Sequence, residues 1–284
     1  KPYKDRVLSV YDFMQTVMEE AAEKSKALRT IRIQAIDKVI GQKSFPLAWS
    51  VDSTQYSMIT FKGYEQAFKT SDVTGFKRMY YDHSRPFSKQ IKFFNQFDGQ
   101  KIITAPLAYV IPQGWYSVID LLKFNGVQMI QLQKDSVINI QTYHIDDYKF
   151  LPRPYEKHHK NNDVKTSIIE QKILFLKGDY AIPMNQRANR YLVEMLEPTG
   201  DDSFFSWNFF DAILQQKEGY SDYRWEDVAA NFLKNNPQLK ADFEQQKQTD
   251  PAFAANAAAQ LNWVYKHSFY YEPSHLRYPV YRIK

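Results

Sequence analysis

The sequence predicts an α+β fold, with a long N-terminal helix, a mixed or antiparallel β-rich middle that contains one helix, and a helical C-terminal part. Three observations predict it. Apolar side chains recur at helical spacing over residues 7–39, short β-branched and aromatic runs fill residues 45–184, and helical spacing returns after residue 185. We therefore expect a closing helix or linker at 1–42, a β-rich accessory domain at 43–184, and a helical part at 185–284 packed on it.

The bulk composition narrows the class of protein. With 284 residues, of which 44% are hydrophobic, the chain can bury a sizeable core. The net charge of +5 comes from dispersed basic residues without a recognisable nucleic-acid module, so we expect no nucleic-acid partner. The chain has no cysteine, which excludes disulfides and thiol catalysis. No apolar run approaches the roughly 18 residues of a membrane span, so we expect none.

The N-terminal segment predicts one long amphipathic helix. Its apolar positions are Val7, Val10, Met14, Val17, Ala21, Leu28, Ile31, Ala35 and Val39, and neither Pro nor Gly occurs between them. A helix of this length needs a partner surface, later in this chain or in an upstream domain. The opening "KPYKDRVLSV" has no initiator Met and no signal-peptide apolar region, so we expect a mature product or a piece of a longer protein.

The middle of the chain predicts strands around one helix. The expected strands are residues 56–64, 90–94, 101–111, 127–133, 136–145 and 166–176. Residues 114–126 predict a helix in which Val118, Leu121 and Leu122 share a face and Gly126 stops the last turn. Only Lys134 and Asp135 separate two of the strands, which predicts a hairpin. The polar stretch 146–165 contains two prolines and predicts a loop.

The last hundred residues predict further helices. Asn236-Pro237 and Asp250-Pro251 each place a capping residue before a proline at the first helical position. The end of the chain, from Tyr270 onward, predicts an extended aromatic tail.

Residues 196–220 mix acids with aromatics and allow two interpretations. Glu197 with Asp202 or Glu218 could form the carboxylate pair of a glycosidase. The favoured interpretation is structural: Asp202 or Ser203 caps a helix, Lys217 lies in its last turn and Gly219 follows as the stop. An inward stripe would then contain Phe210, Ile213 and Leu214. Trp207 and Phe209 lie on other faces and stay open as contacts to another domain.

No catalytic motif stands out. None of the six histidines lies in an HExxH or His-x-x-Glu pattern, and there is no nucleophile elbow or phosphate loop. The weak metal candidates are His144, Asp146, His158 and His159, with Asp147 and Glu156 nearby, and a solvated polar loop is the favoured alternative. Trp115 and Tyr116 could stack on a peptide or sugar, or anchor a helix to the sheet.

Several segments together resemble a known family. They are "AYVIPQGW" (108–115), "GDYAIPMNQRANRYLVEMLEP" (178–198), "DSFFSWNFFDAILQQKEGY" (202–220), "NPQLKADFE" (236–244), "DPAFAANAAAQLNWVYKHSFYYE" (250–272) and "YPVYR" (278–282). Their order resembles the C-terminal half of bacterial zinc carboxypeptidases of the carboxypeptidase A-like metallopeptidases. The opening, residues 1–13, is similar to the segment that follows the catalytic glutamate strand there.

This resemblance implies an accessory, non-catalytic region. The family holds zinc with a His-x-x-Glu pair and a distant His, and a later Glu activates the metal-bound water. None of these residues can be carried onto this chain, since the catalytic Glu would lie just before Lys1. We expect zinc in the catalytic domain of the parent, which would also be the partner of this region and would bind the peptide substrate. The resemblance implies a periplasmic or secreted location.

Two alternatives remain. The chain could be an autonomous peptide- or glycan-binding module that uses Trp115, Tyr116, Trp207 and Trp263. It could also hold a metal-dependent activity at residues 144–159.

Overall fold

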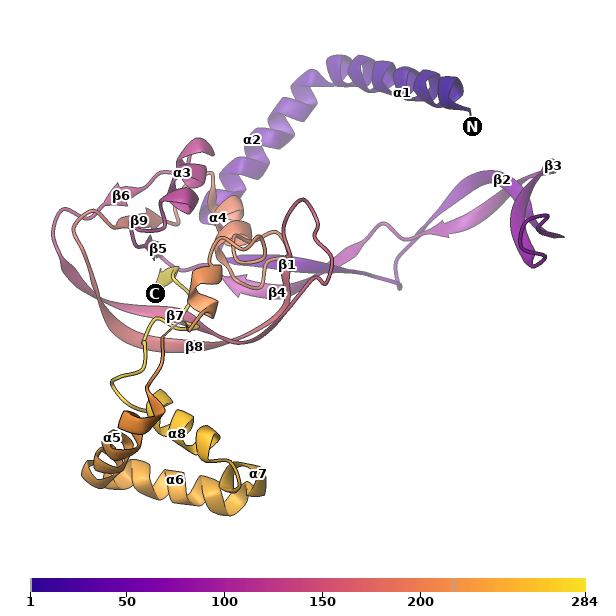
Figure 1. Ribbon diagram of the computed structural model, residues 1–284. Coiled ribbons are helices and arrows are strands. Elements are labelled where there is room, and N and C mark those ends of the chain that lie inside the picture. Colours follow the sequence, from indigo (N-terminus) through magenta and orange to yellow (C-terminus); the bar gives the residue numbers. More distant parts are fainter. Residues whose placement is uncertain (1, 217) are drawn as a thin grey trace. The chain divides into compact units, whose positions relative to one another are not determined.

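The computed structural model describes residues 2–216 and 218–284 and confirms the predicted α+β class (Figure 1). The chain forms two compact units, one made of residues 44–104 and the other of the segments before and after it. The domain division that we expected, at 1–42, 43–184 and 185–284, stays a prediction. Among the described residues, no helix is long and apolar enough to cross a membrane.

The larger unit contains a six-stranded sheet in the order β6-β9-β5-β10-β7-β8. Its strands are β5 (Ala108–Ile111), β6 (Ile130–Gln131), β7 (Ser136–Phe150), β8 (Asn161–Phe175), β9 (Tyr180–Pro183) and β10 (Tyr281–Ile283). All the pairs are antiparallel. The C-terminal strand β10 pairs with both β5 and β7, so the end of the predicted aromatic tail is part of the sheet (Figure 1).

The helices that follow β5 and β9 bury apolar side chains. Helix α4 (Asn189–Leu196) buries its three leucine and valine side chains, and α3 (Tyr116–Phe124) buries Val118, Ile119 and Leu122. The predicted stop is confirmed, because Gly126 has a φ of 73° just after α3. Leu121 is 37% exposed, so its predicted place on the buried face is wrong. The buried face is centred between Val118 and Ile119, about a quarter turn away from Leu121.

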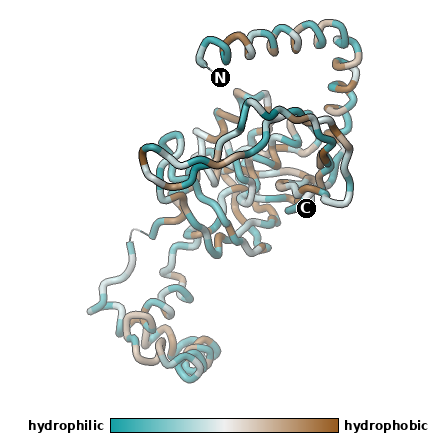
Figure 2. Tube along the Cα trace, turned by 90° about the vertical axis from the view of Figure 1, so that its right-hand side faces the viewer, coloured by the Kyte–Doolittle hydropathy of each residue, from teal (hydrophilic) through white to brown (hydrophobic). Residues whose placement is uncertain are grey.

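The predicted N-terminal helix is present in two segments, α1 (Tyr3–Glu23) and α2 (Ser25–Gly41), with Lys24 between them. Neither helix contains a buried residue, although apolar residues recur along both (Figure 2). The end of α2 is tied to α4, because Asn189 Nδ2 donates to the carbonyl oxygens of Val39 and Ile40 at 3.3 and 3.1 Å. These bonds satisfy carbonyls that a helix end leaves without a partner.

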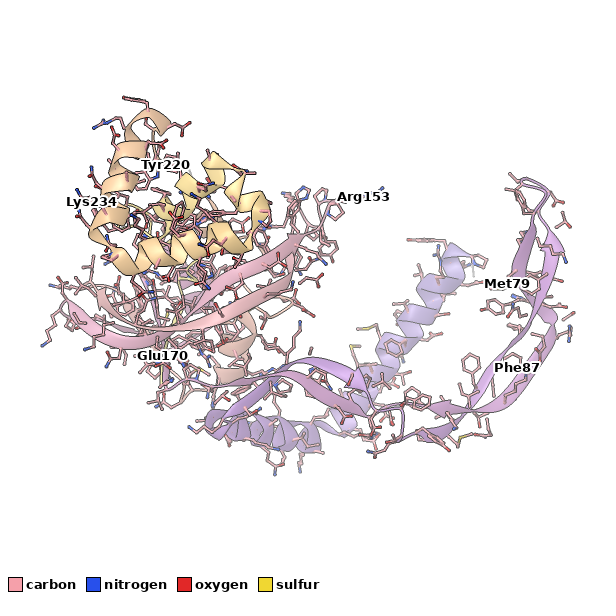
Figure 3. The ribbon with its side chains drawn as sticks, turned by 90° about the horizontal axis from the view of Figure 1, so that it is seen from below. Met79, Phe87, Arg153, Glu170, Tyr220 and Lys234 are labelled. Atoms are coloured by element: carbon pink, nitrogen blue, oxygen red, sulfur yellow. The ribbon has the colours of Figure 1, made fainter. Side chains whose placement is uncertain are left out.

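The smaller unit consists of two antiparallel pairs. Strand β1 (Ser44–Val51) pairs with β4 (Phe97–Thr104), and β2 (Ser57–Thr70) pairs with β3 (Lys77–Phe93). The β2–β3 ribbon, on which Figure 3 labels Met79 and Phe87, has no buried residue. Met79 is 45% exposed, and the Phe87 ring lies 6.1 Å from that of Phe61. A two-stranded ribbon is marginally stable alone in water, so the exposed apolar side chains of a ribbon of this length call for a covering surface.

The C-terminal helices pack on one another around an aromatic cluster. They are α5 (Asp222–Asn235), α6 (Pro237–Thr249), α7 (Pro251–Ala254) and α8 (Ala257–Lys266), and the buried cluster contains Trp225, Phe243, Phe253, Val264 and Tyr265. Both predicted prolines start a helix. Asp250 is a cap as expected, accepting from the amides of the second and third residues after it at 3.0 Å. Asn236 is not, because its Nδ2 donates to the Phe232 carbonyl at 2.7 Å.

In the middle of the chain one prediction is wrong and another is only partly right. Lys134 and Asp135 do not form a hairpin turn, because β6 pairs with β9. Half of the predicted loop at 146–165 is strand, since β7 and β8 pair along almost their whole length and leave only residues 151–160 as the connection. Cross-strand pairs such as Asp147 with Lys165, at 2.8 Å, let these polar residues stay in the ladder.

The predicted helix after Asp202 is also wrong. Residues 201–210 form turns, and only a short 3₁₀ helix, η1 (Asp211–Leu214), follows them. Asn208 has a φ of 66°, the left-handed conformation that interrupts a right-handed helix. Phe210 and Ile213 are buried as predicted. Lys217 lies outside the described residues, so its place in a last turn stays a prediction.

Candidate functional site

A hollow of about 350 Å³ with polar and aromatic lining lies where the β7–β8 hairpin meets η1. Its walls come from the end of β7, the 151–160 connection, the start of β8 and the turn before η1. The lining residues are Tyr148, Phe150, Lys157, His158, His159, Asn161, Asn208, Asp211 and Leu214. This volume lies in the lower part of the range of small-molecule pockets, about 300–1,000 Å³.

Two amide side chains hold the carboxylate of Asp211. Asn161 Nδ2 donates to Asp211 Oδ1 at 2.9 Å and to the Phe205 carbonyl at 3.0 Å. Asn208 Nδ2 donates to Asp211 Oδ2 at 3.0 Å and to the His159 carbonyl at 3.0 Å. Both hydrogens of each amide nitrogen are used in these bonds. The amide oxygens of Asn161 and Asn208 therefore remain as acceptors.

The electrostatics of the hollow centre on Asp211. Burial raises the pKa of this carboxyl group above its usual range, while the bonds from Asn161 and Asn208 and the nearby His158 oppose that rise. Lys157, on the 151–160 connection, supplies a positive charge to the lining. The Asp211 carboxylate and the Lys157 ammonium therefore both line the hollow, and the formal charge of the lining is zero when the two histidines are neutral.

A tight turn fixes the two histidines. Tyr155 and His158 exchange backbone hydrogen bonds at 2.8 and 2.9 Å, and the two residues between them have φ values of 49° and 70°. His159 Nδ1 lies 2.8 Å from the Leu151 carbonyl oxygen. A carbonyl can only accept, so this nitrogen carries the proton and Nε2 of the neutral ring is an acceptor.

Trp207 lies beside the hollow in a charged setting. The Lys160 ammonium is 4.1 Å from the centre of the Trp207 ring and 3.0 Å from Asp202 Oδ1, and Trp207 Nε1 donates to the same carboxylate oxygen at 3.2 Å. The hydrogen bond from Lys160 lowers the pKa of Asp202. The edge of the indole meets the His158 ring at 5.4 Å, so Trp207 would report on changes in the hollow.

The structure does not bring the metal candidates together. His144 pairs with Asp146 at 2.9 Å on β7, whereas His158 and His159 belong to the hollow. Within residues 2–216 and 218–284, no group of three or more acidic or histidine side chains is placed to hold a metal ion.

The other aromatic candidates lie in different surroundings, and their roles stay predictions. Trp115 meets Phe210 edge to face at 4.9 Å, and Phe209 meets Phe204 in the same way at 5.1 Å. Trp263 stacks on His267 at 3.9 Å. Tyr116 is 71% exposed on the first turn of α3, where a partner could reach it.

The glycosidase interpretation fails at Glu197. This residue is fully buried; its Oε1 accepts from Tyr109 Oη at 2.6 Å and lies 3.3 Å from Arg282 Nε. A carboxylate enclosed in this way cannot reach a sugar in a cleft. Asp202 forms an ion pair with Lys160, so Glu197 and Asp202 both make structural contacts.

The sequence did not reveal three of the residues that line the hollow: Asn161, Asn208 and Asp211. Asn161 and Asp211 are 50 positions apart, and Asn208 belongs to a stretch that we expected to be helical. The only signal in the sequence that could have pointed to them is that Asn208 and Asp211 are three positions apart. That spacing also fits two residues on one face of a helix, so it does not identify a site.

Comparison with known proteins indicates a carboxypeptidase-related region. The chain is 28% identical over 123 residues to "Carboxypeptidase 2" of Trichophyton tonsurans and of Trichophyton equinum, and 27% identical over 123 residues to that of Trichophyton rubrum. Each match covers 43% of this chain and 23% of the relative, so it spans about a quarter of the length of these proteins. No protein-family model matches the chain, and no solved structure is similar to it.

Proposed function

We propose that this chain is the accessory region that follows the catalytic domain of a bacterial, exported zinc carboxypeptidase of the carboxypeptidase A-like metallopeptidases. The observation that carries the proposal is the similarity to fungal carboxypeptidases, which the order of the segments from residue 108 to residue 282 supports. The parent enzyme would hydrolyse C-terminal peptide bonds. This region would pack on the catalytic domain or shape access to its cleft.

The surface of α1 supports a role in contacting another domain. Val10, Met14 and Val17 follow one another at spacings of four and three and are 60%, 50% and 43% exposed. Contiguous exposed apolar surface marks an interaction site, and an isolated helix gains little stability in water without one. We assign this face to the upstream catalytic domain, for which α1 would be the closing helix or the linker.

The proposal places the zinc chemistry outside this chain. A catalytic zinc needs three protein ligands and an open position, and it activates a bound water for attack on the peptide carbonyl. No residue of this chain is assigned as a ligand or general base. Its contribution would be to fold against the catalytic domain and to limit which substrates reach the cleft.

A peptidase assay tests this proposal. The purified chain is incubated with zinc and with N-blocked peptides that end in aromatic, aliphatic or basic residues, and the released amino acid is measured by mass spectrometry. We expect no release above the metal-free control, and release once the upstream catalytic domain is joined to the chain. Clear turnover by residues 1–284 alone would place an active site within this chain and overturn the proposal.

A further inference from the structure

We propose that the hollow around Asp211 binds a neutral saccharide of one or two sugar rings. This binding site is separate from the proposed peptidase chemistry and does not depend on it. The inference rests on the charges, the hydrogen-bonding groups and the aromatic walls of the hollow.

The charges favour a neutral ligand. The lining carries one carboxylate, Asp211, and one ammonium, Lys157. Their opposite charges give a ligand of either sign no net attraction, whereas an uncharged polar ligand can accept from Lys157 and donate to Asp211.

The hydrogen-bonding groups favour hydroxyls. The Oδ1 atoms of Asn161 and Asn208 remain acceptors because their amide hydrogens are used, and His159 Nε2 is an acceptor in the neutral ring. The carboxylate of Asp211 adds further lone pairs. A wall with several acceptors and one ammonium donor suits a ligand whose groups both donate and accept, and each sugar hydroxyl does both.

The walls favour a ring with an apolar face. Phe150 is 62% exposed and lines the hollow with Tyr148, whose ring is held edge-on against Phe205 at 6.3 Å. An exposed aromatic face gains from covering by the C–H side of a sugar ring. Asn161 is 4% exposed and Asp211 is held by two amide donors, so the polar side of the hollow is preorganised for such a ligand.

The test is binding of maltose, cellobiose and N,N′-diacetylchitobiose, measured by saturation-transfer NMR and by titration of tryptophan fluorescence. At least one disaccharide is expected to bind saturably at millimolar concentration. Phe150→Ala and Asp211→Asn are expected to weaken that binding tenfold or more. Phe124→Ala is the matched control, because Phe124 is 88% exposed on α3, and it should leave binding unchanged.

Folding of the variants must be separated from binding. Asn208→Gly keeps the left-handed φ at no steric cost while removing one of the two amides that hold Asp211, so it should weaken binding even in a folded protein with an unchanged circular dichroism spectrum. Absence of saturable binding for all three disaccharides would overturn the proposal. Binding that persists unchanged in folded Phe150→Ala and Asn208→Gly variants would also overturn it.

Discussion

Tyr109 donates a 2.6 Å hydrogen bond to Glu197, and both residues are fully buried. The bond joins β5 to the end of α4, and Arg282 of β10 reaches the same carboxylate at 3.3 Å. Arg282 also donates to Tyr143 Oη at 2.8 Å. Side chains from three distant parts of the chain, β5, β7 and β10, therefore gather around one buried carboxylate.

The first prediction concerns this buried group. Arg282→Met should lower the free energy of unfolding by about 3–5 kcal/mol, because it leaves Glu197 as a buried charge without its cation. Urea denaturation measures the change. Lys149→Met is the control, since Lys149 and its partner Asp163 are both largely exposed, and it should have no resolvable effect. Equal stability of the two variants would show that Arg282 does not stabilise the carboxylate.

The second prediction is a dependence of stability on alkaline pH. Burial, and secondly the charge of Glu197, raises the pKa of Tyr109 and of Tyr143 above the ordinary value of about 10. The folded state then holds these protons more tightly than the unfolded chain. Their contribution to stability is fully present below pH 10 and is lost as pH rises beyond it, when the unfolded chain releases its tyrosine protons.

Tyr109→Phe isolates this effect. The difference in the free energy of unfolding between the parent chain and the variant should shrink as pH rises above about 10, because the variant has one proton fewer to lose. Urea denaturation at several pH values from 7 to 11 gives the difference. A constant difference across that range would contradict the prediction.

A third prediction separates the exposed helix from the core. Val10→Asp should leave the free energy of unfolding of the chain unchanged, because no residue of α1 is buried. Leu192→Ala in α4 should lower it by about 2–5 kcal/mol, because Leu192 is fully buried. Both are read from denaturant unfolding. A large loss in Val10→Asp would mean that α1 is packed within this chain.

A fourth prediction concerns the tryptophan beside the hollow. Lys160→Met should destabilise the fold by about 0.5–2 kcal/mol, because it removes the ammonium 4.1 Å from the Trp207 ring. It should also shift the Trp207 emission, which Trp207→Phe identifies among the five tryptophans of the chain. Emission that is the same with and without Lys160 would contradict this arrangement.

Local signals in the sequence predicted the ends of several helices. Pro237 and Pro251 start helices because proline suits the first helical position, and Gly126 ends α3 because it adopts a positive φ. These effects depend only on nearby residues. The alternation of the strands also marked most of the sheet.

Non-local features could not be predicted in this way. Strand β10 pairs with β5 and β7 across more than a hundred residues, and nothing in "YPVYR" specifies those partners. The left-handed Asn208 broke a stretch with otherwise helical spacing. The hollow assembles residues as far apart as Tyr148 and Leu214, so it could be seen only once the chain was folded.

Hydrogen exchange of α1 tests most directly the central claim that this chain packs on an upstream catalytic domain. Exchange is compared between residues 1–284 alone and the same chain joined to that domain. We expect the α1 amides to exchange at least tenfold more slowly in the longer protein, because docking of the Val10, Met14 and Val17 face suppresses local opening. Equal exchange rates of α1 in the two proteins would contradict the claim.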